Sequence, residues 1–246
     1  YFQKNYQIAP DEPCVPIVTE ETTEFTNNAR ASVKTVYELI VSDLTYAIEK
    51  LEGFERPDKA KIDQQVAYGL RARAYLDMGL WAEAAADAEK AAEGYTPATM
   101  EEVSKPFLYD ITEHNWIWGY DMTLDNAKRE LYATSSSWLR SFSAEGYAPA
   151  TGTYSRINNI LYNKIPATDV RKGWWVDENL HSPLLAHVNW GGVTGDDVAT
   201  LAIENVKLAF DPYTNVKFGM YTYGSTTNEE DWPFMRVEEM ILIQAE

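Results

Sequence analysis

Residues 65–97 constrain the fold more than any other part of the chain, because they read as two helices joined by a tight turn. Small or aromatic residues recur at helical spacing, at Tyr68, Ala72, Tyr75, Gly79, Trp81, Ala84, Ala88 and Ala91. Small side chains at such positions let two antiparallel helices pack with their backbones close together. One helix pair cannot bury its own apolar face, so we expect neighbouring helices to cover it.

The order and spacing of these residues resemble a tetratricopeptide repeat. A further helix is expected just before it, with Ser32 as N-cap and an apolar face formed by Val36, Ile40, Leu44, Ala47, Ile48 and Leu51. Gly53 and Pro57 end that helix. We therefore predict paired helices at about residues 33–51, 65–78 and 81–93.

The remainder of the chain is less regular. Three prolines make residues 1–32 read as an extended connector. Residues 95–235 are rich in Trp, Tyr, Gly and Thr, with a short strand expected at 116–120, a helix start at 135–142 and a short helix around 198–208. Helical spacing returns at 236–246. We predict a mainly α fold, in which helical residues 1–94, a loop-rich part at 95–235 and a returning helix at 236–246 form one continuous domain.

Composition excludes several classes of function. The 246 residues carry 38 acidic and 21 basic side chains, for a net charge of −17. Such a surface repels phosphate backbones, so no nucleic-acid partner is expected. No run of about 18 apolar residues is present to span a membrane. The single cysteine, Cys14, is expected to be a thiol in a loop, and both ends look cut from a longer protein.

Four blocks of sequence together resemble the SusD/RagB family. They are YELIVSDLTYAIEKL, RARAYLDMGLWAEAAADAEKA, LYNKIPATDVRKGWW and DWPFMRVEEMILIQAE. The last block is the most specific, at Arg236, Glu239, Leu242, Ala245 and Glu246. The resemblance implies tetratricopeptide-like helix pairs packed against an irregular region with a few short strands.

The same resemblance implies a role. Members of this family are lipid-anchored on the extracellular face of the outer membrane. They bind glycans or peptides without hydrolysing them and hand them to a SusC-like TonB-dependent transporter. The lipid-bearing cysteine would lie upstream of Tyr1. Ligand-contacting residues vary from member to member, so the resemblance assigns no binding residue.

Binding residues must come from chemistry. Sugar rings stack their C–H faces on aromatic side chains, and their hydroxyls need polar partners. Aromatic residues set among turn-forming residues are the candidates for a ligand site, namely Trp138, Tyr147, Tyr154 and Trp190. Each could instead be a core residue, since buried aromatics are the commoner case. Apolar neighbours make core positions the stronger expectation for Trp116, Trp118, Trp174 and Trp175.

No catalytic residue, metal ligand or cofactor is predicted. Residues 121–126 alternate oxygen ligands as a calcium loop does, but lack its glycine and downstream glutamate. The abundant acids could include a glycosidase carboxylate pair, although abundance alone identifies none. The leading hypothesis is glycan binding and delivery to a transporter. Peptide or glycoprotein binding in the same role, and a tetratricopeptide scaffold for protein partners, stay open.

Overall fold

The computed structural model of the chain describes residues 5–23, 27–104, 110–121, 123, 156–187, 189, 192–199, 211–217 and 231–246. The chain divides into two compact units. Unit 1 comprises Tyr1–Pro97, His114–Gly119 and Phe234–Glu246, and unit 2 comprises Ala98–Glu113 and Tyr120–Pro233. The predicted single domain with boundaries at 94 and 235 stays a prediction.

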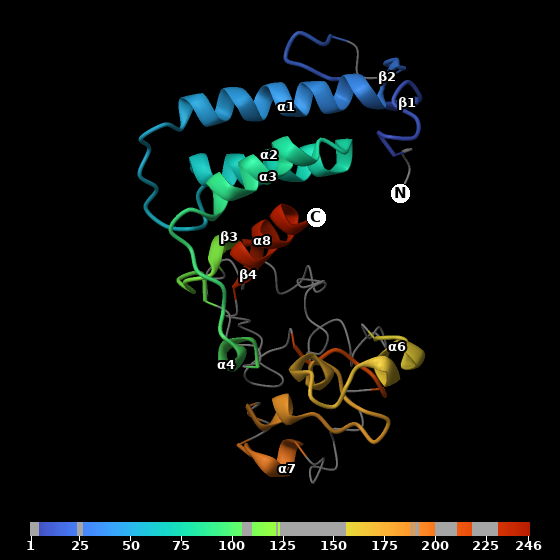
Figure 1. The fold of residues 1–246 in the computed structure, drawn as a ribbon, viewed down its shortest axis with the longest axis vertical. Coiled ribbons are helices and arrows are strands. Elements are labelled where there is room, and N and C mark those ends of the chain that lie inside the picture. The colour runs from blue at the N-terminus through green and yellow to red at the C-terminus, as the bar shows by residue number, and fades with distance from the viewer. Residues whose placement is uncertain are drawn as a thin grey trace. The chain divides into compact units, whose positions relative to one another are not determined.

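Unit 1 is built on four helices, α1 (Val33–Lys50), α2 (Gln64–Met78), α3 (Trp81–Ala92) and α8 (Val237–Ala245). Helix α2 packs against both α1 and α3, and α8 packs against α3 (Figure 1). The three predicted helices and the returning helix are therefore confirmed, each within two residues of the expected bounds.

Close packing of α2 on α3 depends on small residues. Ala72, Ala84, Ala88 and Ala91 are completely excluded from solvent, as the repeat-like spacing predicts. Gly79 ends α2 in the left-handed region at φ 76°, which glycine adopts without the steric cost that a Cβ brings. Trp81, although part of the repeat-like spacing, is the first residue of α3 and is 48% exposed.

A two-stranded sheet and the buried Met235 side chain complete the core of unit 1. Strands β3 (Trp116–Tyr120) and β4 (Trp232–Arg236) pair in a two-stranded sheet, so the strand predicted at 116–120 is confirmed. Met235 on β4 is buried in the same apolar cluster as Ile117 and residues of α2, α3 and α8. A Cβ on Gly69 of α2 would overlap the end of the Met235 side chain, so a larger residue there would require the thioether to shift.

Two arginines on α2 tie the helices together. Arg71 donates to both carboxylate oxygens of Asp87 on α3, at 2.6 and 2.9 Å, and to the Thr45 hydroxyl on α1 at 2.8 Å. Arg73 donates to both carboxylate oxygens of Glu239 on α8, each at 2.6 Å. Bidentate pairs of this kind fix orientation as well as adding energy. Helix α2 is thereby joined to α1, α3 and α8.

The N-terminal segment is more ordered than predicted. Strands β1 (Pro13–Pro16) and β2 (Arg30–Ser32) pair antiparallel and pack on α1, where an extended connector was expected. Arg30 supports this pairing by donating to the carbonyls of Pro13 and Cys14. Cys14 is buried in β1 rather than lying in a loop. Ser32 caps α1 as expected, because its hydroxyl accepts from the Thr35 backbone N–H at 3.1 Å.

The described part of unit 2 contains short elements. They are α4 (Met100–Val103), α6 (Asn159–Lys164), η1 (Val170–Trp174), η2 (Pro183–His187) and α7 (Asp196–Ala199). The helix start predicted at 135–142 lies outside the described residues, as does most of the helix predicted around 198–208. None of the helices described in the chain is long and apolar enough to cross a membrane.

Replacing Ala84 by leucine tests the helix packing. Ala84 has no exposed surface, so the larger side chain has to push α2 and α3 apart. We expect the free energy of unfolding to fall by about 1–3 kcal/mol in urea titrations followed by circular dichroism. Ala86→Leu, at an exposed position of the same helix, is the matched control and should change it little. Equal stabilities of the two variants would contradict the assigned interface.

Candidate functional site

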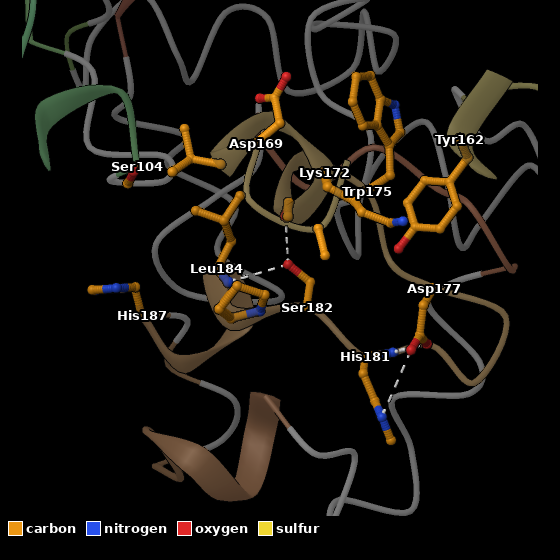
Figure 2. A pocket seen from close by; sticks show the side chains of 14 residues that line it. Ser104, Tyr162, Asp169, Lys172, Trp175, Asp177, His181, Ser182, Leu184 and His187 are labelled. Carbon is orange, nitrogen blue, oxygen red and sulfur yellow. Dashed lines mark hydrogen bonds and ion pairs between the residues drawn. The ribbon is translucent and has the colours of Figure 1, made fainter. Parts of the chain in front are cut away.

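A cavity of about 530 Å³ opens in unit 2. Its walls come from α6, η1, η2 and the turn between η1 and η2 (Figure 2). The lining side chains include two aromatic rings, two carboxylates, a lysine and two histidines, namely Tyr162, Trp175, Asp169, Asp177, Lys172, His181 and His187. This size lies within the range of small-molecule sites, and the mixture of rings and polar groups suits an amphipathic ligand.

Side-chain caps set the directions of α6 and η1. Asn158 accepts from the Ile160 backbone N–H at 2.8 Å and starts α6. Asp169 accepts from the Arg171 backbone N–H at 3.0 Å and starts η1. Pro166 stops the first helix within two residues of its end, since proline cannot continue a helix. These local signals bring α6 and η1 to the same cavity.

Ser182 holds η2 against η1. Its hydroxyl donates to the Gly173 carbonyl at 2.6 Å and accepts from the Leu184 backbone N–H at 3.1 Å (Figure 2). A Cβ on Gly173 would lie 3.1 Å from the Pro183 ring, so the two elements approach closely at a glycine. The buried serine therefore fixes the distance between two walls of the cavity.

The backbone around Trp175 is held by residues 211–217. Val176 N–H donates to the Thr214 carbonyl at 3.0 Å, and Val216 N–H donates to the Trp174 carbonyl at 2.7 Å. Trp175 is extended, so its side chain and that of Val176 point to opposite sides. Val176 is completely buried, whereas Trp175 is half-buried and lines the cavity.

Tyr162 forms a second aromatic surface of the cavity. Its ring lies 5.1 Å from that of Tyr213. The Lys172 ammonium lies 5.1 Å from the Tyr162 ring centroid (Figure 2). Burial raises the pKa of Tyr162, and the nearby Asp177 charge raises it further. The phenol therefore remains protonated at neutral pH and can donate a hydrogen bond to a ligand.

Asp177 organises the turn that enters the cavity. One carboxylate oxygen accepts from the backbone N–H groups of Asn179 and His181, both at 2.8 Å. The other lies 3.9 Å from the His181 ring nitrogen Nδ1 (Figure 2). Leu180 in this turn has φ 67°, a left-handed conformation that a side chain rarely adopts. Asp177 thus holds the turn with one oxygen, while its second oxygen lies beside His181, and both residues line the cavity.

The charged groups of η1 are paired locally. Arg171 donates three side-chain hydrogen bonds to the Asp169 carboxylate, at 2.6 to 3.1 Å. These bonds, together with the Arg171 backbone N–H, lower the pKa of Asp169. Lys172 donates to the Ile165 carbonyl at 3.0 Å. Among the described residues, no group of three or more His, Cys, Asp or Glu side chains is placed to hold a metal ion.

The predicted ligand residues Trp138, Tyr147, Tyr154 and Trp190 lie outside the described residues, so that site stays a prediction. The expectation that Trp175 is a core residue is wrong, because its neighbour Val176 takes the buried side of the extended segment. Trp116 is 1% exposed, which confirms its core position. The alternation of Trp175 and Val176 after a helix cap at Asp169 is the signal that could have identified the cavity wall.

Comparison with solved structures shows the fold. A SusD-like carbohydrate-binding protein from Bacteroides vulgatus matches 99% of this chain at a TM-score of 0.67, with 24% identical residues. Surface glycan-binding protein A from Bacteroides thetaiotaomicron, in complex with laminarihexaose, matches 98% at a TM-score of 0.59 and 15% identity. A laminarin-binding SusD-like protein matches 94% at 0.57 and 17% identity.

The chain spans about half the length of these structures, covering 46%, 53% and 54% of them respectively. No family model matches the sequence, and no curated protein is similar to it. The structural matches nevertheless confirm the mainly α, SusD-like fold that the four sequence blocks predict.

The Asp169–Arg171 pair gives a measurable pH dependence. The pKa of Asp169 is below its ordinary value, so the pair stabilises the fold at higher pH and is lost as the pH falls through that lowered value. In carbon-13 NMR titrations, Arg171→Gln should raise the midpoint of the Asp169 carboxyl carbon. Arg156→Gln, which removes the partner of Asp211, should leave it unchanged. A midpoint that is the same in wild type and Arg171→Gln would contradict the pairing.

Proposed function

We propose that this chain binds a glycan in the cavity of unit 2 and does not alter it. The observation that carries the proposal is the joint presence of a half-buried Trp175 ring and several hydrogen-bonding side chains in one concave site. The SusD-like fold supports it, since one structural neighbour is described as carbohydrate-binding and another was solved with laminarihexaose.

The lining chemistry suits a sugar. A pyranose ring has an apolar C–H face, and stacking this face on an indole ring stabilises the complex. The hydroxyls around the ring lose hydrogen bonds to water on binding, so they need polar partners in the site. Around Trp175, the Tyr162 hydroxyl can donate and the second Asp177 oxygen can accept. His181 and His187 offer further ring nitrogens. The cavity therefore can replace much of the lost hydration.

We also propose the wider role that the sequence blocks imply. In it, the protein lies on the extracellular face of the outer membrane, held by a lipid anchor outside this chain, and passes the glycan to a SusC-like TonB-dependent transporter. Co-purification of such a transporter with the full-length protein, and protease sensitivity of the protein on intact cells, test these two points.

Truncating Trp175 tests the site. Losing one stacking ring should weaken binding about ten- to a hundredfold. We suggest isothermal titration with laminarin, pullulan and galactomannan, comparing wild type with Trp175→Ala. Trp81→Ala removes an equally large ring that is 48% exposed on unit 1, and should leave the affinity unchanged. Thermal melts of each variant verify that the fold is kept.

Three further results discriminate the alternatives. If Trp175→Ala binds normally and Trp138→Ala or Trp190→Ala does not, the ligand site lies on the loop aromatics predicted from sequence, including Tyr147 and Tyr154. Release of reducing ends above a heat-denatured control would overturn the assignment as a binding protein. Binding of denatured protein or peptides in place of all three glycans would favour a peptide or glycoprotein ligand.

A further inference from the structure

The cations near the cavity are already engaged. The Arg171 guanidinium is held by the Asp169 carboxylate through bonds from both Nε and a terminal nitrogen. Arg171 does not itself line the cavity, whereas Asp169 does. An anionic ligand at this wall therefore meets the Asp169 carboxylate, whose partner Arg171 lies outside the lining.

Lys172 is the cationic residue of the described lining, and its ammonium is also in use. It donates to the Ile165 carbonyl at 3.0 Å and lies over the Tyr162 ring. An anion there would share the ammonium with a carbonyl and an aromatic face, both of which already stabilise it. Figure 2 shows the lysine side chain extended toward Tyr162.

The cavity lining also contains two acidic side chains. Asp169 and Asp177 both line the cavity, and Asp177 presents its second oxygen beside His181. A carboxylate or sulfate on a sugar would approach these charges at short range, where like charges repel each other. Sugar hydroxyls, in contrast, can donate to the same oxygens.

We infer that the cavity selects uncharged glycans over uronic or sulfated ones, and that the Asp169–Arg171 pair determines this selectivity. The inference rests on the proposed glycan site in unit 2. The net charge of −17 acts in the same direction at long range, since it repels polyanionic chains before they reach the cavity.

Asp169→Asn tests the inference by releasing the arginine. Asparagine caps a helix as well as aspartate does, so η1 should keep its start. Asp211→Asn is the matched control, because it releases Arg156 in the same unit and neither of those residues lines the cavity. Each protein is titrated with laminarin, pullulan and galactomannan, and with the same polymers oxidised to carboxylates at C6. Measurements at pH 8 keep ordinary histidines neutral.

For one or more of the three neutral polymers, wild type should bind the neutral form about tenfold more tightly than the oxidised form. In Asp169→Asn, the ratio of the affinity for the oxidised form to that for the neutral form should rise about tenfold, and in Asp211→Asn this ratio should match wild type. The gain should fall with added salt and vanish in the double variant Asp169→Asn, Arg171→Gln.

Three results are unfavourable, and they differ in what they contradict. Equal or tighter binding of an oxidised polymer by wild type overturns the selectivity. An unchanged preference in a folded Asp169→Asn protein overturns the role of the Asp169–Arg171 pair. Binding of none of the six polymers by wild type overturns the proposed function itself, and the inference with it.

Discussion

The bidentate contact of Arg73 with Glu239 is the constraint on which unit 1 depends. It joins α2 to α8 across 166 positions of sequence, and the same guanidinium donates to the Phe234 carbonyl at 2.7 Å. Unit 1 consists of segments that are far apart in the chain, so it folds only when these segments pack together. A planar, fork-shaped donor meeting a carboxylate and a carbonyl specifies one relative placement of α2, α8 and β4.

Apolar packing then supplies what the ion pair cannot. The pair itself is only half-buried, and contacts of that kind add modestly to stability. Met235, Met240 and Ile243 bring the large apolar surfaces that fill the space beside the alanines of α2 and α3. Gly69 makes room for Met235, so the glycine and the methionine act as one packing unit. The Arg73 contacts fix the orientation of the packed segments, and apolar burial supplies most of the stabilising free energy.

The cavity of unit 2 is built by a different principle. Its elements are too short for helix periodicity to define them, and each is oriented by a single side chain that caps or bridges the backbone. Asn158 starts α6, Asp169 starts η1, and Ser182 joins η1 to η2. Polar groups that bond the backbone leave aromatic and charged neighbours facing outward.

This contrast explains what the sequence could predict. The spacing of Ala72, Ala84, Ala88 and Ala91 depends on helix geometry alone, so it located α2 and α3 within two residues. The β1–β2 pair was missed because Pro13 and Pro16 argue against strands, while Arg30, 14 positions beyond Pro16, is what stabilises them. Trp175 was misassigned because its apolar neighbours in sequence favour a core position, whereas Val176 alone takes the completely buried side of this extended segment.

Hydrogen–deuterium exchange of the intact protein with and without a bound neutral glycan tests the central claim most directly. A ligand in the cavity should slow exchange in residues 158–187 and 211–217, because those backbone amides hold the walls, and should leave α1, α2 and α3 unchanged. Slowed exchange confined to the helices of unit 1 or to residues 124–155, with none in residues 158–187, would place the ligand elsewhere and contradict the account.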